Sequence, residues 1–463
     1  MLRTLSLLLA LAVTVVSASQ PARRNVSLIV TGATVVTMDA SARVLTPGAV
    51  AIDGRDIVAV DTADAIAQRF SASETIDAAG QVVMPGLINT HTHAPMVLYR
   101  GLADDLALMD WLQKYIFPAE AKTVSPEFVR AGTRLAALEM IQSGTTAYAD
   151  MYYFEEEIAK ATKEAGLRGV LGETIIQFPV PDAKTPKEGI ARAVAFIRQW
   201  KDDDLIVPAI APHSMYTLDA DTLKEIRRTA DRERAPVIIH LAETQDEVKI
   251  AQEKYKTTPV QFLESIGFWG DRTLAAHGVH LTSADIGILA KRHVGVSHNP
   301  ESNMKLASGA APVIELQKAG VTVGLGTDGA ASNNDLDMFE AMRQAAFLHK
   351  LVTKDPRALP AHTALRMATI DGAKTLGLDR QIGSLEAGKR ADLIVVSMRS
   401  ARQSPMYDAL SHLVYVTRGD DVRTTIVNGR TLMRDRRVLT LNENEILNDT
   451  ANWAAKVREA VKQ

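Results

Sequence analysis

Two histidines that stand two residues apart are the first candidates for chemistry in this sequence. His91 and His93 follow the apolar stretch 82–88, at a point where a strand is expected to end. Residues i and i+2 of a strand face the same way, so both imidazoles would enter one space. Imidazole is the commonest neutral nitrogen ligand of Zn²⁺ or Fe²⁺. A chain with 11 histidines can also form such a pair by chance, so a metal site requires further ligands at matching positions.

Further candidate ligands stand at the ends of other apolar runs. The runs are Leu87–His91, Gly144–Asp150, Arg168–Ile176, Leu205–His213, Val237–His240, Thr273–His277, Val294–His298 and Val321–Asp328. The first run and the last five end in His91, His213, His240, His277, His298 and Asp328. Histidine is usually scattered through a chain, so this placement predicts a metal site among the run-ending side chains. His298 is expected to be a structural histidine or to support a ligand, and not to be a ligand itself.

Amphipathic helical stretches alternate with the apolar runs, which is typical of β/α units. The predicted helices are Pro126–Ser143, Glu155–Gly166, Lys187–Trp200, Leu218–Arg234, Pro259–Gly267, Ser283–Lys291, Ala311–Gly320 and Asp335–Lys350. Eight strands and eight helices predict an α/β fold of the (β/α)8 TIM-barrel type. Because a TIM barrel holds its active site at the C-terminal ends of its strands, this edge is the predicted site.

The segments on either side of the barrel predict a second, smaller domain. Alternating patterns typical of strands cover 27–36, 49–52, 57–60 and 74–77. The same alternating pattern occurs again at 391–396, 422–427 and 431–433. We therefore predict a small β-sandwich domain whose halves are 25–84 and 385–440, with the catalytic barrel at 85–384. The last segment, 441–463, is polar and predicts a C-terminal helix on the surface.

The composition limits the kinds of partner and of metal site. The 463 residues are 46% hydrophobic and 23% charged, as in a soluble globular protein, and the formal net charge is −3. This charge gives no reason to expect nucleic acid or an anionic membrane as a partner. The chain has no cysteine, which excludes disulfides, thiolate zinc sites and the deaminases whose zinc has histidine and cysteine ligands. Any metal must therefore be bound by histidine, aspartate or glutamate.

The first 18 residues have the pattern of a secretory signal peptide. Arg3 precedes the apolar stretch Leu5–Val16, and small residues follow at Ser17 and Ala18. The apolar stretch is shorter than the roughly 20 residues that span a membrane. We expect cleavage, export to the periplasm or the medium, and no membrane attachment afterwards. A retained N-terminal anchor is the alternative on the same pattern.

Longer motifs surround the candidate ligands. They include P-G-L-I-N-T-H-T-H-A-P-M at 85–96, A-P-H-S at 211–214, H-L-A-E-T at 240–244, A-A-H-G-V-H at 275–280, S-H-N-P-E-S-N at 297–303 and G-T-D-G-A-A-S-N-N at 326–334. With these motifs the chain resembles the amidohydrolase superfamily, and within it the 5′-methylthioadenosine/S-adenosylhomocysteine deaminases, to which the s-triazine hydrolases are related. The resemblance extends from about residue 25 to residue 433.

The resemblance implies one divalent metal ion per chain, zinc with iron as the alternative, bound by His91, His93, His240 and Asp328. Three neutral nitrogens and one carboxylate suit a catalytic site that keeps one position open for water. Two-metal members of the superfamily use a carboxylated lysine at a strand end. No apolar run of this chain ends in lysine, so we expect a single metal.

The expected catalytic roles follow from charge, position and the resemblance. A metal lowers the pKa of bound water towards about 7 and so generates hydroxide near neutral pH. Asp328 is expected to take the proton, and His277 to stabilise the attacking hydroxide or the developing charge. Glu243 stands three residues after His240 and is expected, as in similar deaminases, to protonate the ring nitrogen and help ammonia leave.

The resemblance also implies a small-molecule substrate, an adenine nucleoside such as 5′-methylthioadenosine, S-adenosylhomocysteine or adenosine. Glu120 would accept hydrogen bonds from the ribose, His213 would contact the purine or ribose, and Trp111 would pack against the thioether or base. Ser332 and Glu243 are expected to line the same pocket. The alternative roles are packing for Trp111 and a helix-surface charge for Glu120.

One departure from the family concerns the tail of the substrate. Some members meet the carboxylate of S-adenosylhomocysteine with arginine just after the third strand, where this chain has Gly172-Glu173-Thr174. A glutamate near the tail pocket would disfavour an acidic tail unless Lys184 or Lys187 binds it.

The alternative function on the same site is an s-triazine hydrolase or a free-base deaminase of the guanine type. We also expect a homo-oligomer.

Overall fold

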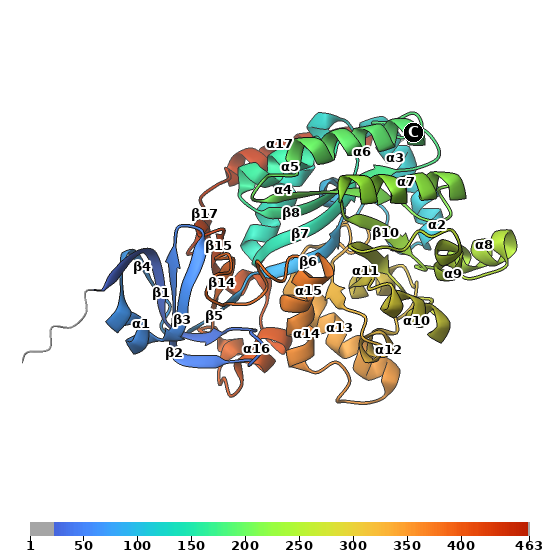
Figure 1. Cartoon of the computed structure of the whole chain (residues 1–463). Coiled ribbons are helices and arrows are strands. Elements are labelled where there is room, and N and C mark those ends of the chain that lie inside the picture. Colours follow the sequence, from blue (N-terminus) through green and yellow to red (C-terminus); the bar gives the residue numbers. More distant parts are fainter. Residues whose placement is uncertain (1–22, 462–463) are drawn as a thin grey trace, which may run out of the picture.

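The computed structural model describes residues 23–461, which form a barrel and a smaller β-domain beside it (Figure 1). The predicted signal peptide, 1–18, lies outside the described residues. Within the described part, no helix combines the length and the apolar character needed to cross a membrane.

Eight parallel strands follow one another around the barrel in the order of the sequence. They are β6 (Leu87–Thr92), β7 (Thr145–Tyr152), β8 (Arg168–Ile175), β9 (Ile206–Pro212), β10 (Val237–Leu241), β11 (Thr273–His277), β12 (Gly295–His298) and β13 (Val323–Leu325). Two contacts draw the last strand to the first. Asn89 Nδ2 donates to Thr327 Oγ1 at 2.7 Å, and the Asp328 N–H donates to the His91 carbonyl at 2.9 Å. The predicted barrel class is confirmed, with a nearly closed ring.

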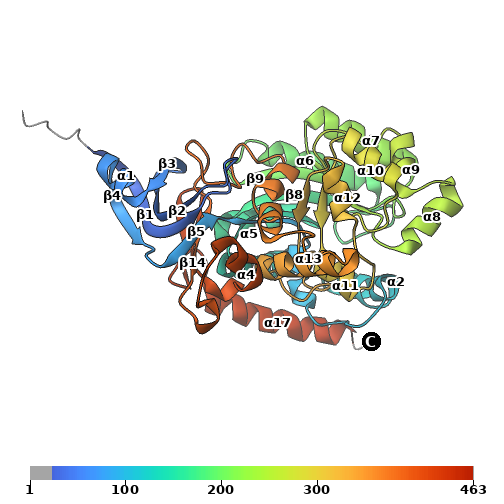
Figure 2. The same ribbon diagram turned by 90° about the horizontal axis from the view of Figure 1, so that it is seen from below.

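Helices cover the outside of the barrel (Figures 1 and 2). They are α4 (Pro126–Ser143), α5 (Glu155–Ala165), α6 (Pro186–Trp200), α7 (Ala220–Glu233), α8 (Gln245–Tyr255), α9 (Pro259–Ser265), α10 (Ser283–Lys291), α11 (Pro300–Lys305), α12 (Val313–Lys318), α13 (Met338–Thr353), α14 (Ala361–Met367) and α15 (Ile370–Thr375). Local signals explain several boundaries. The Ser125 side chain accepts a hydrogen bond from the Phe128 N–H at the start of α4, and Gly144 ends this helix at a φ of 90°.

Several parts of the barrel differ from the prediction, and two of them bear on the site. Strand β13 contains three residues, so Asp328 lies beyond the strand and adopts a φ of 65°. In this conformation the Asp328 N–H donates a hydrogen bond to the His91 carbonyl.

The first β/α connection, 93–125, is mostly helical. It contains η1 (Ala94–Tyr99), α2 (Leu108–Trp111), η2 (Leu112–Ile116) and α3 (Phe117–Thr123). Elements α2, η2 and α3 follow one another without a break, so residues 108–123 form one helical stretch with a π-helical turn inside it. This turn interrupts the regular helical period, which explains why the pattern of the sequence did not predict the stretch.

Segments from both ends of the chain form the β-domain. Its strands are β1 (Arg24–Val36), β2 (Val44–Asp53), β3 (Asp56–Thr62), β4 (Phe70–Asp77), β5 (Gln81–Pro85), β14 (Leu393–Ser397), β15 (Val422–Val427), β16 (Arg430–Arg434) and β17 (Arg437–Val438). The helical elements of the two segments are α1 (Ala63–Arg69), η3 (Ala401–Gln403), α16 (Ala409–Tyr415) and η4 (Gly419–Asp421). All nine strands belong to one mixed sheet, and the two segments meet where β14 pairs antiparallel with β5. The predicted union of the two terminal segments is thus confirmed.

A buried ion pair links the β-domain to the barrel. Arg168, the first residue of β8, donates its Nε–H to Asp392 Oδ2 at 3.0 Å, and both side chains are 2% exposed. Asp392 also accepts a hydrogen bond from the Asn428 N–H at 2.7 Å. Because removing one partner of a buried ion pair costs about 3–5 kcal/mol, both residues stabilise the junction of the two parts.

Candidate active site

Four histidines and one aspartate converge at the C-terminal ends of the barrel strands. One ring nitrogen from each of His91, His93 and His240 lies within 4.8 Å of the other two. One ligand atom from each of His91, His277 and Asp328 meets the same limit. His93 Nε2 lies 3.3 Å from His240 Nε2. The Nε2 atoms of His91 and His93 each lie 3.4 Å from Asp328 Oδ1. This geometry brings three imidazoles and one carboxylate around a common point.

Backbone carbonyls orient two of these histidines. The His93 Nδ1–H donates to the Met151 carbonyl at 2.6 Å, and the His240 Nδ1–H donates to the His213 carbonyl at 2.8 Å. In a neutral ring these bonds leave Nε2 unprotonated and facing the cluster. His91 is fully buried, and neither of its ring nitrogens has a hydrogen-bond partner. Buried nitrogens without partners, together with a carboxylate, are a donor set that fits a divalent metal ion.

Asp328 is held in place by three donors. Ser302 and Ser332 donate their hydroxyls to Oδ2 at 2.6 and 3.0 Å, and the Gly329 N–H donates to Oδ1 at 2.8 Å. Burial raises the pKa of Asp328, but the surrounding histidines outweigh this effect and hold it well below its usual range. The left-handed backbone conformation at Asp328 is uncommon outside glycine and often marks functional positions. The carboxylate is therefore ionised and fixed in orientation.

Glu243 lies in the loop between β10 and α8 and faces His277. Glu243 Oε2 is 3.7 Å from His277 Nε2, and the His277 Nδ1–H donates to Asn303 Oδ1 at 2.9 Å. Burial raises the pKa of Glu243, which favours the protonated carboxyl that a general acid requires. Burial lowers the pKa of His277, but the carboxylates of Glu243 and Asp328 raise it by more. The pair is arranged to hold a proton beside the metal-binding cluster.

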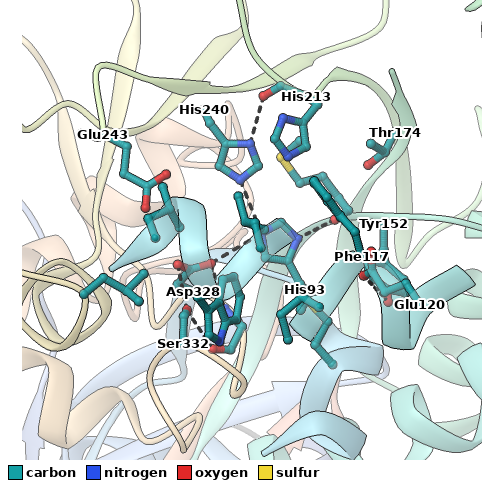
Figure 3. A pocket seen from close by; sticks show the side chains of 18 of the residues that line it. His93, Phe117, Glu120, Tyr152, Thr174, His213, His240, Glu243, Asp328 and Ser332 are labelled. Carbon is teal, nitrogen blue, oxygen red and sulfur yellow. Dashed lines mark hydrogen bonds and ion pairs between the residues drawn. The ribbon is translucent and has the colours of Figure 1, made fainter. Parts of the chain in front are cut away.

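A pocket opens onto this cluster (Figure 3). Of the ten residues predicted for the site, all except His91 line it: His93, Trp111, Glu120, His213, His240, Glu243, His277, Asp328 and Ser332. His91 is buried behind them. In Figure 3, Glu243 and Glu120 lie on opposite sides of His93. The pocket therefore has a buried glutamate on either side of His93.

Glu120 provides the second polar end of the pocket. Its side chain comes from α3, is buried, and accepts a hydrogen bond from the Tyr152 hydroxyl at 2.7 Å. Burial raises the pKa of Glu120 to about 7. A carboxylate can accept several hydrogen bonds, so Glu120 retains capacity for hydroxyl groups of a ligand.

Apolar side chains of the first β/α connection form one wall of the pocket. They are Met96, Leu108, Trp111, Leu112, Ile116 and Phe117. Leu306 of the β12–β13 connection adds to this surface. No lysine or arginine occurs among the lining residues of the described chain. This wall is suited to an uncharged group.

The expectation of a glutamate beside the tail pocket was wrong. Successive residues of a strand point to opposite sides, and on β8 it is Thr174 that lines the pocket. Glu173 points away and accepts a hydrogen bond from the Arg192 Nε–H at 2.7 Å. Neither Lys184 nor Lys187 lines the pocket, so neither lysine offers the alternative charge.

Several residues of the site were not predicted from the sequence, and four of them bear on its chemistry or shape. Tyr152 pairs with Glu120, Asn303 orients His277, Ser302 bonds to Asp328, and Phe117 lines the apolar wall. Ser302 and Asn303 stand in the motif at 297–303, which was the available signal.

His298 ends an apolar run but neither joins the cluster nor lines the pocket, as expected for a structural histidine. His298, the last residue of β12, is buried, and its Nε2 lies 3.2 Å from Nε2 of His349 on α13. The His298 ring therefore contacts α13, a helix outside the barrel, and not the metal-binding cluster. A histidine at the end of a strand does not by that position alone become a metal ligand.

A (β/α)8 barrel with a histidine and aspartate cluster at its strand ends is the architecture of metal-dependent hydrolases. The chain matches the family model described as the amidohydrolase family over residues 82–432, and it belongs to this family. It is an enzyme of the kind that acts on carbon–nitrogen bonds. Members of the family typically bind a divalent metal, in line with the histidine cluster.

Relatives and solved structures agree with this assignment. The chain is 49% identical to a 5-methylthioadenosine/S-adenosylhomocysteine deaminase of Syntrophobacter fumaroxidans, over 91% of this chain and 96% of the relative. It is 48% identical to a 5′-deoxyadenosine deaminase of Methanosarcina barkeri, over 93% and 98%. A crystal structure of an adenosine deaminase from Xanthomonas campestris with bound zinc superimposes with a TM-score of 0.93 at 40% identity, over 95% and 100%.

Proposed function

We propose that this protein is a metal-dependent deaminase that converts an adenine nucleoside and water to the inosine analogue and ammonia. One observation carries the proposal. A single pocket joins the histidine cluster and Glu243 at one end to the buried carboxylate of Glu120 at the other. A nucleoside needs both ends, because its amine-bearing ring must meet the reacting groups while its ribose hydroxyls need an acceptor.

His91, His93, His240 and Asp328 would hold one divalent metal ion, zinc or iron, in this pocket. Such a metal lowers the pKa of water towards about 7 and so supplies a hydroxide nucleophile at neutral pH. The backbone hydrogen bonds of His93 and His240 support this role, because they present the unprotonated Nε2 of both rings.

The residues of the chain account for the proton transfers of the reaction. Asp328, ionised and fixed by Ser302 and Ser332, accepts a proton from the attacking water. Glu243 gives its proton to the purine ring nitrogen next to the carbon that is attacked. His277 stabilises the charge that develops on the oxygen. The new carbon–oxygen bond replaces the carbon–nitrogen bond, and the amine leaves as ammonia with the proton that Asp328 holds. The proton that remains on the new hydroxyl group returns to Glu243, which restores the acid and leaves the carbonyl of the inosine analogue.

Glu120 would accept hydrogen bonds from the ribose hydroxyls, and His213 would contact the purine or ribose. Trp111 packs against the base or the 5′-group, and Ser332 lines the pocket beside Asp328. The apolar wall without a cation favours an uncharged 5′-group. We therefore propose 5′-methylthioadenosine, 5′-deoxyadenosine or adenosine as better substrates than S-adenosylhomocysteine, whose tail is charged.

The test is ammonia release from these four nucleosides by zinc-loaded protein with a measured metal content. The proposal expects turnover of at least one uncharged nucleoside, with a lower kcat/KM for S-adenosylhomocysteine. A protein that holds one metal per chain and releases no ammonia from any nucleoside would refute it. Guanine and an s-triazine, assayed in parallel, identify the alternative use of the same site.

We also propose that the mature protein is exported and forms a homo-oligomer. The pattern of residues 1–18 supports export. The exposed apolar side chains Phe347, Leu351 and Val352 of α13 support an interface between subunits. Fractionation of the producing cells and light scattering of the purified protein test the two statements.

A further inference from the structure

The C-terminal helix α17 (Glu443–Val461) lies against the part of the barrel that carries Glu120. It packs on α4, α3 and η1 and runs along the barrel towards the first β/α connection (Figure 2). That connection supplies Met96 from η1, Trp111 from α2, and Phe117 and Glu120 from α3 to the pocket. The helix is therefore placed to affect the pocket wall without touching the pocket.

A row of aromatic rings connects α17 to η1. The partly buried ring of Trp453 meets Phe128 edge to face, with ring centroids 5.4 Å apart. Phe128, fully buried in the first turn of α4, packs on Tyr99 at 5.1 Å. Aromatic pairs in such arrangements stabilise packing beyond the apolar area that they bury. Trp453 thus closes the outer side of a stack that ends at the last residue of η1.

Hydrogen bonds extend this stack to α3. The Thr123 hydroxyl donates to the Ala119 carbonyl at 2.8 Å, so the Tyr99 hydroxyl must donate to Thr123 Oγ1, at 2.6 Å. A second contact comes directly from α17, where the Ala460 carbonyl accepts a hydrogen bond from Lys122 Nζ at 2.8 Å. These bonds hold the residues on both sides of Glu120.

Helix α3 has few means to hold Glu120 by itself. It is the last part of a continuous helical stretch, 108–123, in which α2, η2 and α3 follow one another without a break. The π-helical turn η2 interrupts the regular hydrogen-bond pattern just before α3, so the position of Glu120 depends on the contacts of α3 with its neighbours. The Glu120 carboxylate has one described partner, the Tyr152 hydroxyl, which leaves room for the carboxylate to shift with its helix.

We propose that α17 is a positioning element for the ribose-binding end of the pocket, and that Trp453 is its main positioning residue. The inference rests on the proposed function, in which Glu120 accepts hydrogen bonds from the ribose hydroxyls. Displacement of α3 by even a fraction of an ångström weakens these bonds while the metal-binding cluster on the other side of the pocket keeps its geometry. Loss of the Trp453 ring therefore changes recognition of the sugar and leaves the reacting groups in place.

The experiment compares adenosine with 2′,3′-dideoxyadenosine, which lacks the hydroxyls that Glu120 would bind. In Trp453→Ala, the ratio of kcat/KM for adenosine to that for the dideoxy analogue is expected to fall about tenfold, through KM, with unchanged metal content. Trp453→Phe keeps an aromatic ring and is expected to restore the ratio. Leu447→Ala removes an exposed side chain of the same helix and serves as the matched control.

The ratio separates positioning from general destabilisation. A smaller folded fraction lowers turnover of both substrates equally, so an unchanged ratio in Trp453→Ala overturns the inference. Hydrogen exchange of the α3 amides adds a readout that needs no activity: faster exchange is expected in Trp453→Ala and wild-type exchange in Leu447→Ala. Unchanged exchange in Trp453→Ala also overturns the inference. Absence of any nucleoside deamination by the wild type, in contrast, counts against the proposed function.

Discussion

The two ends of the pocket are built in different ways. At the metal-binding end, His91, His240 and His277 belong to barrel strands, and backbone carbonyls or side-chain donors fix the orientation of His93, His240 and Asp328. At the end proposed to bind the sugar, Glu120 and Trp111 belong to one helical stretch, 108–123, of a long connection, and α17 packs on the part of it that carries Glu120. Hydrogen-bonded strands hold three of the proposed reacting groups, whereas packing between helices, with a few hydrogen bonds, holds Glu120.

Under the proposed function, this difference means that the groups that carry out the reaction and the groups that recognise the substrate are held by different parts of the fold. Strands of a barrel are tied on both sides, so a change in an outer helix scarcely moves their ends. A connection of short helices moves more easily and tolerates new side chains, which allows the substrate preference to change on a constant reaction site. Substitutions at the two ends should accordingly affect different kinetic constants.

The largest effect is expected from His240→Ala at the metal-binding end. This change removes one of three converging imidazoles, so the variant should lose its metal, and ammonia release should fall at least about 10³-fold. Metal analysis after gel filtration and an ammonia assay measure the two effects. His362→Ala, at a histidine outside the cluster, is the control and should keep both metal and activity. Full metal content in His240→Ala would remove this residue from the ligand set.

Glu243→Gln should separate proton transfer from metal binding. The amide retains the shape of the side chain but cannot deliver a proton, so kcat should fall by about 10²–10³-fold while one metal per chain remains. Single-turnover kinetics together with metal analysis test this. Activity close to that of the wild type would show that another group protonates the ring.

Glu120→Gln probes the sugar end. The variant keeps Tyr152 as a neighbour but loses the charged acceptor, so kcat/KM for adenosine should fall about 10- to 100-fold. Turnover of 2′,3′-dideoxyadenosine should hardly change, because it has no hydroxyls to bind. If kcat/KM fell equally for both substrates, Glu120 would have a structural role, and the proposed difference between the two ends of the pocket would be wrong.

The pKa of Glu120, raised to about 7 by burial, predicts a pH effect at the same end. Above this pH the side chain is a carboxylate that accepts hydrogen bonds, and below it the protonated group accepts them less well. KM for adenosine should therefore rise as the pH falls through about 7, by up to about tenfold per unit. The Glu120→Gln variant and the dideoxy analogue should both lack this dependence. A wild-type KM that is constant between pH 6 and 8 would argue against a titrating Glu120.

The smallest effect is expected from Ser332→Ala. Ser332 and Ser302 donate to the same oxygen of Asp328, at 3.0 and 2.6 Å, so the remaining serine still orients the carboxylate. We expect about a tenfold loss of kcat/KM or less, and a larger loss in Ser302→Ala. Parallel kinetics of the two variants test this order, and the reverse order would give Ser332 a direct contact with the substrate.

Much of the barrel could be predicted because its signals are local. The limits of α4, 126–143, were predicted as they are found, because the Ser125 cap and the left-handed Gly144 mark both ends. His91 and His93 were predicted to converge with the other ligands because the period of a strand and the order of a barrel place them at one edge.

Other features of the site depend on neighbours far away in the sequence. Strand β8 is buried along its whole length, so its composition shows no alternation that would tell Glu173 from Thr174. The contacts of Glu120 with Tyr152, and of Trp453 with Phe128, join segments 32 and 325 residues apart. Such pairs form only when separate elements pack, because no short stretch of chain contains both partners.

The sequence by itself determined the barrel class and, together with the family resemblance, most of the residues that converge at its edge. The physical reason is that the periods of strands and helices, the helix caps and the ends of the apolar runs all depend on residues that are close together in the sequence. Only the tertiary structure decided which strand residue faces the pocket, which side chains orient His277 and Asp328, and which helix supports Glu120. These properties are contacts between distant segments, and the packing of the whole chain selects them.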